Sequence, residues 1–464
     1  MKVSLSWLKD YVSINMDTDQ LVEALTMVGL EVESVFDRWK YLEEVIIGRI
    51  CDIHPHPNAE RLRLCNLDLG NRTIRVACGA PNVAPDLLVP VALPGTTFPD
   101  GSVLEETVIR GILWEGMICS ETELGLGTDS SGVMSLNRSL TVGDKISSAL
   151  DLSDTIIEID LTPNRPDCLS IIGIAREIAG IQKTRLRYPF HDVSDSGNKI
   201  SKMTSVNIEA SDLCPRYAAR LVTDISIGPS PYWLQDRLRS VGLRPINNIV
   251  DITNFVLMET GQPLHAFDYE RLGGKRIVVR TSSEGELFTT LDNKEHRLTK
   301  DTLMICDAEK PVAIGGVMGG LNSEIETTTR SVLIESAYFN PTSIRKTAKS
   351  LGINTEASYR FERGVDPEGT ITALNRAAQL MAELGGGNIV AGIIDEYPNP
   401  VPTPKIALRA KDTNRLLGTR FNTDEIKDLL ESIEFNVNSE NPEILTVVPP
   451  SFRVDVTRPE DLME

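Results

Sequence analysis

The run Val45-Ile46-Ile47-Gly48-Arg49-Ile50-Cys51-Asp52-Ile53 is rich in β-branched residues, which favour strands. Three further runs of this character follow at residues 61–69, 73–77 and 88–93, separated by clusters of Pro, Gly and Asn. Short strands at close spacing with turn signals between them are typical of a small barrel. We therefore predict a β-barrel domain over residues 40–150.

The segments on both sides of this barrel are predicted to be mainly helical. Before it, Asp17-Thr18-Asp19-Gln20 resembles a capping box that precedes an amphipathic stretch, and residues 1–39 form an N-terminal α+β segment. After it, a helix capped by Ser170 and ending near Gly180 follows a loop rich in Pro and Asn. We expect residues 151–200 to return to the first domain and to include a polar linker that extends to residue 204.

Residues 205–397 alternate between strand-like and helix-like segments without the regular rhythm of a βαβ fold, which favours an α+β domain. Its predicted helices cover residues 232–243, 246–257 and 341–352, and its predicted strands cover residues 276–281, 303–305, 312–314 and 332–334. A second linker at 398–404 leads to a C-terminal α+β segment over 404–464, of winged-helix-like type, with a predicted helix at 424–433 and a predicted strand at 444–448. The fold class is therefore α+β multidomain.

The composition is that of an ordinary folded protein, with 41% hydrophobic and 24% charged residues in 464. The formal net charge of −19 means that any contact with nucleic acid must come from local basic surface. Seven scattered cysteines without a Cys-x-x-Cys motif argue against a disulfide framework or a zinc ribbon. We expect a cytoplasmic protein in a reducing compartment, with neither a membrane nor DNA as partner.

Several ordered segments resemble the beta subunit of bacterial-type phenylalanyl-tRNA synthetase (phenylalanine–tRNA ligase), and the resemblance runs from end to end. The segments lie at residues 3–8, 56–62, 78–83, 116–120, 160–167, 244–255, 262–268 and 354–367. In that family the segment at residues 452–464 continues into a long C-terminal part, so the resemblance implies a C-terminally truncated subunit.

The resemblance implies an OB-fold tRNA-binding domain at 40–150, an editing domain at 205–397 and a truncated metal-site domain at 404–464. It also implies an alpha subunit as partner in an alpha2-beta2 tetramer that uses ATP to charge tRNA(Phe) with phenylalanine. The editing domain of such a subunit hydrolyses mischarged Tyr-tRNA(Phe). An apolar pocket rejects an added hydroxyl only about a hundredfold, whereas a site that hydrogen-bonds the hydroxyl discriminates by ~10⁴–10⁵.

The resemblance assigns catalytic positions to His265, Glu335, Thr355 and Ala357. We expect Glu335 at the point where an apolar strand gives way to a loop, where it recognises the phenol; the alternative is a strand-end carboxylate in water. We expect His265 in a loop just after a helix that ends at Gly261, where it positions or deprotonates the attacking water. Asp268 orients the imidazole if that loop folds back. The alternatives are a histidine satisfied within the turn and assistance from the substrate's own ribose hydroxyl.

The resemblance also places a set of polar and glycine residues around the editing pocket: Arg244, Asn247, Asp251, Asn254, Gly316 and Gly319. Helical spacing puts Asn247, Asp251 and Asn254 on one face, opposite Ile246, Ile249, Val250 and Thr253. The alternative for these residues is a buried polar network that joins two helices. Residues 315–320 lack the Gly-Lys-Ser/Thr of a phosphate loop, so we predict a tight strand–turn–strand instead.

Contacts with tRNA are expected from Arg61, Arg63 and Asn82 in the barrel. A basic group near the editing pocket, Lys346, Lys349, Arg360 and Arg363, is a second candidate surface, with a solvated face as the alternative.

The family's Mg²⁺ set, shared with the alpha subunit, corresponds to Asp455, Asp461 and Glu464, and its next carboxylate falls beyond Glu464. We expect weak or absent Mg²⁺ binding, and the alternative is a charged helix start after Pro459.

Two other functional classes compete with this interpretation. The first is a non-catalytic tRNA-binding or assembly scaffold that has lost hydrolysis. The second is a nucleotide-dependent ligase complete in one chain, which is disfavoured because the sequence contains no nucleotide-binding loop.

Overall fold

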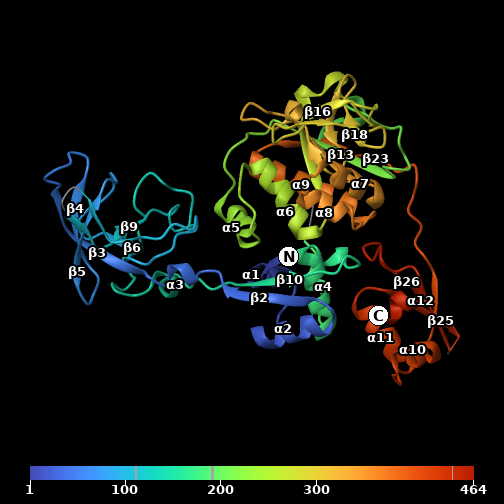
Figure 1. Ribbon diagram of the computed structural model, residues 1–464, viewed down its shortest axis with the longest axis horizontal. Coiled ribbons are helices and arrows are strands. Elements are labelled where there is room, and N and C mark those ends of the chain that lie inside the picture. The colour runs from blue at the N-terminus through green and yellow to red at the C-terminus, as the bar shows by residue number, and fades with distance from the viewer. Residues whose placement is uncertain (110–111, 190–192, 442) are drawn as a thin grey trace. The chain divides into compact units, whose positions relative to one another are not determined.

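The computed structural model describes residues 1–109, 112–189, 193–441 and 443–464, and it contains two compact units (Figure 1). One unit consists of residues 35–156, and the other combines residues 1–34 with residues 157–464. Among the described residues, no helix is both long and apolar enough to cross a membrane.

The unit of residues 35–156 is built on a five-stranded antiparallel sheet in the order β5-β4-β3-β6-β9. The strands are β3 (Val45–Pro55), β4 (Arg63–Asp68), β5 (Thr73–Cys78), β6 (Leu88–Ala92) and β9 (Met117–Ile118). The two end strands, β5 and β9, contact each other, so the sheet nearly closes on itself around Ile50, Leu67 and Val91. The prediction of a small barrel is confirmed at this level. Smaller elements complete the unit: η1 (Lys40–Leu42), β7 (Thr107–Ile109), β8 (Ile112–Trp114) and α3 (Ile146–Ala149).

The N-terminal segment combines strands with helices. A three-stranded sheet has the order β1 (Lys2–Ser4), β10 (Thr155–Asp160), β2 (Glu31–Asp37), and it accompanies α1 (Leu5–Tyr11), α2 (Thr18–Met27) and α4 (Ile171–Gln182). The capping box at Asp17 and the N-cap at Ser170 are confirmed. The mainly helical prediction for residues 1–39 missed β1 and β2, whose pairing partner β10 lies over 100 residues away in sequence.

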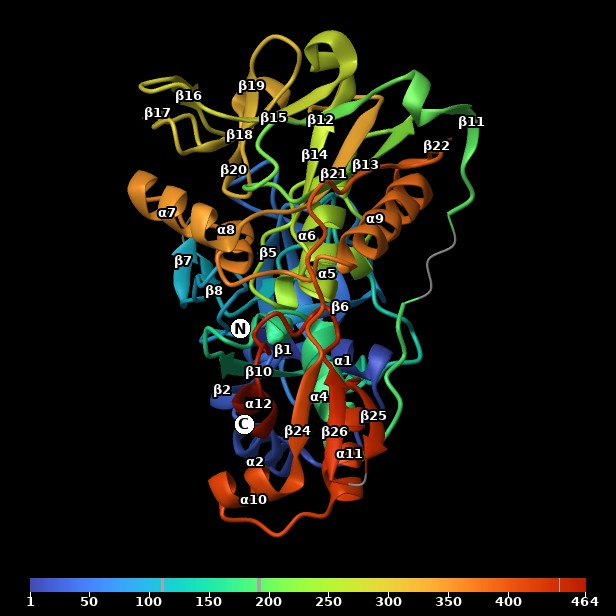
Figure 2. The same cartoon turned by 90° about the vertical axis from the view of Figure 1, so that its right-hand side faces the viewer.

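The centre of the larger unit is a sheet covered on both faces (Figure 2). Its strands run in the order β11 (Ser196–Lys199), β22 (Asn388–Ala391), β13 (Arg216–Thr223), β21 (Val332–Tyr338), β14 (Leu264–Asp268), and β23 (Ile394–Glu396) also pairs with β13. One face packs on α6 (Asn248–Thr260) and α9 (Gly369–Gly385) through residues such as Ala218 and Ile334. The other face, which includes Tyr217 and Leu333, packs on a second sheet.

The second sheet has the order β12 (Val206–Ile208), β15 (Ile277–Thr281), β18 (Leu303–Cys306), β19 (Pro311–Ile314), β20 (Met318–Gly319). The remaining elements of this region are α5 (Tyr232–Ser240), β16 (Leu287–Thr289), β17 (Glu295–Arg297), α7 (Pro341–Leu351), α8 (Glu356–Phe361) and the short η2 (Pro166–Cys168), η3 (Ile200–Lys202), η4 (Tyr269–Arg271), η5 (Gly273–Lys275) and η6 (Leu321–Ser323). The predicted linker to residue 204 was too long, since β11 and η3 fall within it, and its residues 190–192 lie outside the described residues.

The C-terminal segment is a three-stranded antiparallel sheet in the order β24 (Ile406–Arg409), β26 (Ile444–Val448), β25 (Asn436–Asn441). It carries α10 (Ala410–Leu417), α11 (Thr423–Ser432) and α12 (Pro459–Met463), and Leu408, Ile426 and Val447 form part of its core. The predicted helix at 424–433 and strand at 444–448 are confirmed.

Candidate functional site

A cavity of about 270 Å³ lies where β14, β21, the β19–β20 turn, α6 and α8 meet. Its lining includes seven of the predicted residues: Asn254, His265, Gly316, Gly319, Glu335, Thr355 and Ala357. These residues are spread over about 100 positions of sequence, and the fold brings them to one hollow. The remaining walls are mainly apolar: Leu257, Leu264, Leu291, Ile314, Val317, Met318 and Phe361.

His265 and Glu335 are direct partners in the register of β14 and β21. Residues opposed on antiparallel strands point to the same face, with Cβ atoms about 4.5–5.5 Å apart. His265 does follow a helix that ends at Gly261, as predicted, but it lies in a strand rather than a loop. The predicted end of the strand at Glu335 was wrong, because β21 continues to Tyr338. The alternative of a solvated Glu335 is also wrong, since the residue is only 7% exposed.

Glu335 accepts one hydrogen bond from a residue that the sequence analysis missed. The Tyr217 hydroxyl of β13 donates to Glu335 Oε2 at 2.8 Å, and both side chains are buried. Among the described residues, no hydrogen-bond donor reaches Oε1. The sequence around Tyr217 indicates a strand, but it does not reveal that this strand pairs with β21 and brings the hydroxyl to Glu335.

The site disfavours charge on both titratable groups. Burial raises the pKa of Glu335 to about 7, and the hydrogen bond from Tyr217 acts in the opposite direction. Burial lowers the pKa of His265 to about 4, so the imidazole is neutral near pH 7. A neutral imidazole offers one ring nitrogen as an acceptor and the other as a donor.

Asp268 does not orient His265. Positions 265 and 268 differ by an odd number along β14, so their side chains point to opposite faces. The Asp268 carboxylate instead accepts hydrogen bonds from Thr329 Oγ1 at 2.8 Å and from the Glu270 backbone N–H at 3.0 Å.

The glycine-rich stretch forms the predicted strand–turn–strand between β19 and β20. A Cβ at Gly319 would lie 2.5 Å from His265 Cε1, so only glycine leaves room for the imidazole. Gly316 has a φ of +67°, and a Cβ there would meet Phe339 at 2.9 Å. These two glycines therefore shape the cavity wall.

Thr355 and Ala357 reach the cavity at the start of α8. Thr355 is the N-cap, and its hydroxyl accepts from the Ser358 backbone N–H at 3.0 Å and donates to the Val317 carbonyl at 3.0 Å. These bonds anchor α8 to the glycine turn and occupy the hydroxyl. Ala357 contributes a small side chain to the lining.

Three predicted pocket residues lie outside the cavity. Asn247 caps α6, and Asp251 accepts from the Ser230 hydroxyl at 2.5 Å and from the Ile246 backbone N–H at 2.7 Å. Arg244 is exposed in the loop before them. The predicted helical faces were wrong, because the helix begins at Asn248, leaving Ile246 67% exposed while Asp251 is 1% exposed. These contacts support the alternative of a buried polar network for Asn247 and Asp251.

The predicted basic group near the cavity is only partly on the surface. Lys346 and Lys349 are exposed on α7. Arg360 is 2% exposed, and its guanidinium donates to the Leu169 carbonyl and to the carboxylate of Glu356, whose side chain is exposed. Arg363 is mostly buried and stacks on the Tyr359 ring at 3.5 Å.

In the barrel, Arg61 and Arg63 are exposed. The Asn82 side-chain amide exchanges two hydrogen bonds with the Val133 backbone, at 2.8 and 2.9 Å. Asn82 therefore closes a loop within the unit, and the two arginines remain as candidate phosphate contacts.

The predicted Mg²⁺ ligands do not fit a metal in this arrangement. Asp455 is held by Arg453 through two hydrogen bonds of 2.9 and 2.8 Å. Asp461 caps α12 by accepting from the backbone N–H groups of Thr457 and Arg458. Within the described ranges, these carboxylates and Glu464 do not form a group with ligand atoms within 4.8 Å of one another.

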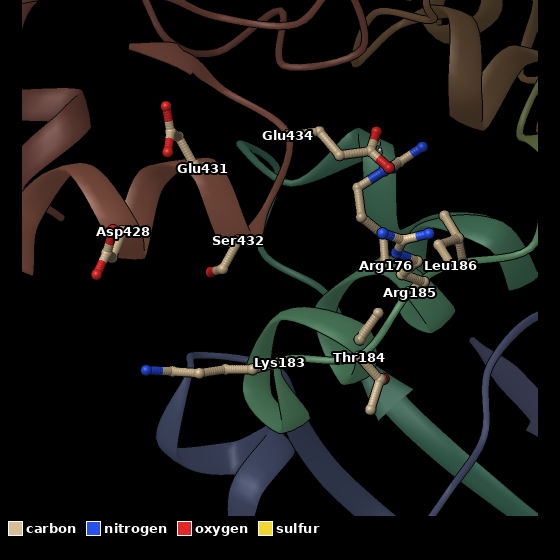
Figure 3. Close-up of a pocket in the computed structure, with 10 residues that line it drawn as sticks. Arg176, Lys183, Thr184, Arg185, Leu186, Asp428, Glu431, Ser432 and Glu434 are labelled. Carbon is tan, nitrogen blue, oxygen red and sulfur yellow. Dashed lines mark hydrogen bonds and ion pairs between the residues drawn. The ribbon is translucent and has the colours of Figure 1, made fainter.

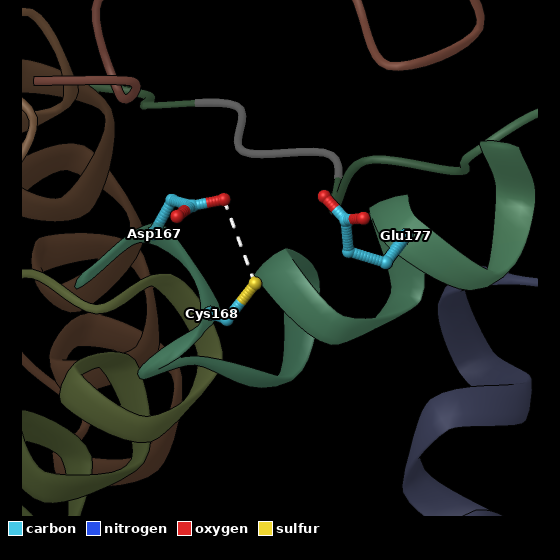
Figure 4. A group of neighbouring side chains, drawn as sticks. All are labelled: Asp167, Cys168 and Glu177. Carbon is cyan, nitrogen blue, oxygen red and sulfur yellow. Dashed lines mark hydrogen bonds between the residues drawn. The ribbon is translucent and has the colours of Figure 1, made fainter. Parts of the chain in front are cut away.

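Among the described residues, one group does meet that spacing: Asp167, Cys168 and Glu177 (Figure 4). The guanidinium of Arg165 already lies among them, with Nη2 2.9 Å from Asp167 Oδ2, 3.1 Å from Cys168 Sγ and 2.6 Å from Glu177 Oε1. This cation pairs with both carboxylates, so the cluster is a structural ion-pair network.

A separate cavity of about 530 Å³ lies between the end of α4 and α11 (Figure 3). Arg176, Lys183 and Arg185 face Asp428, Glu431 and Glu434 across it, and Arg176 pairs with Glu434 at 3.2 Å. It contains none of the predicted site residues.

Comparisons with known protein families match the barrel unit, the central region and the C-terminal segment. Residues 213–386 match the B3/4 domain, residues 406–464 match the tRNA synthetase B5 domain, and residues 45–145 match the family described as "Putative tRNA binding domain". Over its full length the chain is 50% identical to the phenylalanine--tRNA ligase beta subunit of Syntrophus aciditrophicus and 47% identical to that of Desulfotalea psychrophila. The chain covers 58% and 57% of those two proteins.

A solved N-terminal fragment of the phenylalanyl-tRNA synthetase beta subunit from Pyrococcus horikoshii is 18% identical, with a TM-score of 0.35, over 67% of this chain and 85% of the fragment. That likeness is too weak to define the fold. The two matches to phenylalanine--tRNA ligase beta subunits extend over the whole of this chain and confirm the resemblance on which the site residues were selected.

Proposed function

From the premise that the whole chain is a relative of phenylalanine–tRNA ligase beta subunits, we propose that it binds tRNA(Phe) and hydrolyses mischarged Tyr-tRNA(Phe). The charging of tRNA(Phe) with phenylalanine belongs to an assembly with an alpha subunit, of alpha2-beta2 stoichiometry, which acts in the cytoplasm with ATP and Mg²⁺. The barrel unit contributes tRNA contacts through Arg61 and Arg63.

One observation carries the editing proposal: a buried carboxylate and a neutral imidazole lie side by side on the sheet face that lines a mainly apolar cavity. Glu335 Oε1 is the acceptor that a phenolic hydroxyl requires at the end of an aromatic slot. A phenylalanyl ring in the same slot would leave that oxygen without a donor, which costs about 1–3 kcal/mol or more for a charged group. The cavity therefore favours tyrosine over phenylalanine, opposite to the preference of a charging site.

Hydrolysis of the ester needs a water molecule directed at its carbonyl carbon. The water oxygen forms the new C–O bond, the bond to the ribose oxygen breaks, and the proton lost by the water goes to that leaving oxygen. His265, with a pKa near 4, is a weak base at neutral pH, because a general base works best when its pKa is near the operating pH. We therefore assign His265 the task of accepting a hydrogen bond from the water and orienting it.

The test is deacylation of Tyr-tRNA(Phe) and Phe-tRNA(Phe) by the purified chain. The wild type is expected to hydrolyse the tyrosyl ester selectively. Glu335→Ala is expected to lose the preference while remaining folded, and His265→Ala is expected to slow the reaction on the order of the 10²-fold that loss of correct positioning costs.

An unchanged preference in Glu335→Ala would remove Glu335 from phenol recognition. No hydrolysis by the wild type would favour a non-catalytic tRNA-binding scaffold.

A further inference from the structure

Tyr217 is a fully buried phenol that contacts the recognition carboxylate from inside the protein. It lies on β13, where its register partner is Ala337, so it is the diagonal neighbour of Glu335 across β13 and β21. Tyr217 and Glu335 are on the same face of the sheet, and the hydroxyl reaches Oε2 at 2.8 Å. Neither side chain has another hydrogen-bond partner among the described residues.

When Glu335 is ionised, the direction of this hydrogen bond is fixed, because a carboxylate has no proton to donate. Burial, followed by the nearby Glu335 carboxylate, raises the pKa of Tyr217 well above its usual value, so the hydroxyl keeps its proton at neutral pH. Tyr217 is then the donor, and Oε2 is the acceptor. Since Oε2 is committed to the protein, Oε1 is the oxygen available to the cavity.

We propose that Tyr217 is a positioning residue for phenol specificity, which holds Glu335 by Oε2 so that Oε1 accepts the hydroxyl of a 4-hydroxyphenyl group. The inference rests on the proposed editing function and adds the residue that prepares its specificity. The carboxylate thereby accepts from two phenols, one that belongs to the fold and one that belongs to the substrate.

The physical role of the inner phenol is twofold. First, it fixes the side-chain torsions of Glu335, so the free oxygen does not need to be ordered when the substrate binds. Second, it donates to the ionised form and thereby opposes the effect of burial on the carboxylate. Hydrogen bonds to an ionised acceptor are about twice as strong as those between neutral groups, so the substrate phenol benefits from that ionisation.

The test is Tyr217→Phe, which keeps the ring and removes the donor. Tyr269→Phe is the matched control, because the Tyr269 hydroxyl is also mostly buried and donates to a carbonyl, that of Met203, outside the cavity lining. Steady-state deacylation of both esters is measured at pH 6 to 9, with kcat and KM determined separately.

Tyr217→Phe is expected to reduce the Tyr-over-Phe preference about tenfold or more at pH 7, the equivalent of 1.4 kcal/mol, mainly through KM. The preference should recover as pH rises, because the remaining carboxyl now ionises at higher pH. The control should follow the wild type. Equal preference in the two variants at every pH would overturn the proposal.

A second measurement separates this inference from the proposed function. The Glu335 carboxyl is titrated by infrared difference spectroscopy, with Glu335→Gln identifying its band. Tyr217→Phe should raise that pKa whether or not the chain deacylates any ester, and an unchanged titration would overturn the role of Tyr217. If the wild type is inactive but the titration shifts, the editing function fails while the hold of Tyr217 on the carboxylate stands.

Discussion

Gly319→Ala is a steric probe of the imidazole in the cavity. The backbone of Gly319 is not in the left-handed region, so alanine is compatible with its conformation. The new Cβ would lie 2.5 Å from Cε1 and 2.8 Å from Nε2 of His265, whereas ordinary contact begins at 3.4 Å. The imidazole ring must therefore move by about 0.9 Å to restore ordinary contact. The third neighbour, Leu291 Cδ1 at 3.1 Å, is the end of a flexible side chain and can give way easily.

A displacement of about 1 Å in a positioning group can reduce the rate on the order of 10²-fold. We therefore expect Gly319→Ala to lower kcat for Tyr-tRNA(Phe) deacylation by about that factor, with less effect on KM because the phenol acceptor Glu335 is untouched. Gly228→Ala is the control: a Cβ there meets nothing within 4 Å. The position of the ring is followed independently by the ¹³Cε1 resonance of His265, assigned with His265→Gln.

The reasoning would be refuted in either of two ways. If Gly319→Ala and Gly228→Ala deacylate Tyr-tRNA(Phe) at the same rate although the His265 resonance has moved, the position of the imidazole does not govern hydrolysis. Alternatively, the rate falls while the resonance stays unchanged, in which case the alanine acts on something other than the ring.

Two further predictions concern buried charge. The folded-state pKa of Glu335, about 7, lies above its ordinary value of 4.5, so the free energy of unfolding falls by about 3 kcal/mol as pH rises from about 4.5 to about 7. Denaturant unfolding should therefore show that Glu335→Gln gains stability relative to the wild type between pH 5 and pH 8. A stability difference between the two proteins that stays constant with pH would contradict the raised pKa. Arg165→Leu should lower the free energy of unfolding by about 3–5 kcal/mol, because it leaves the Asp167 and Glu177 carboxylates buried without their cation. Thermal unfolding tests this, and a midpoint equal to that of the wild type would show that these carboxylates are paired in another way.

Local signals in the sequence predicted the elements that depend on local chemistry. The capping box at Asp17, the N-cap at Ser170 and the helix from Pro341 to Gly352 each have a chemical cause within a few residues of the boundary. The β-rich runs of the barrel were also readable, because each is bounded by turn residues. The β19–β20 turn followed from its glycines.

Strand pairing was the information that the sequence did not contain. The end of β21 was misplaced because Glu335 and Ser336 interrupt an apolar run, although both are buried in the sheet. Ser336 donates to the Thr370 carbonyl, and Glu335 accepts from Tyr217, so each polar group finds a partner on a distant segment. Arg360 was misread for the same reason, since its acceptor at Leu169 lies 191 residues away.

The cavity presents two side-chain acceptors, Glu335 Oε1 and one imidazole nitrogen of His265, and these restrict what it can hold. Glu335 presents Oε1, the imidazole of His265 presents one unprotonated nitrogen, and the nearby hydroxyls of Tyr217 and Thr355 already donate to the protein. A ligand that satisfies both acceptors must bring two hydrogen-bond donors, one to Glu335 and one to His265. A tyrosyl ester with an attacking water supplies both donors, whereas a phenylalanyl ester supplies only the water. The discrimination between tyrosyl and phenylalanyl esters therefore depends on Glu335 Oε1. Tyr217 keeps this oxygen available, because its hydroxyl binds the other oxygen of the same carboxylate.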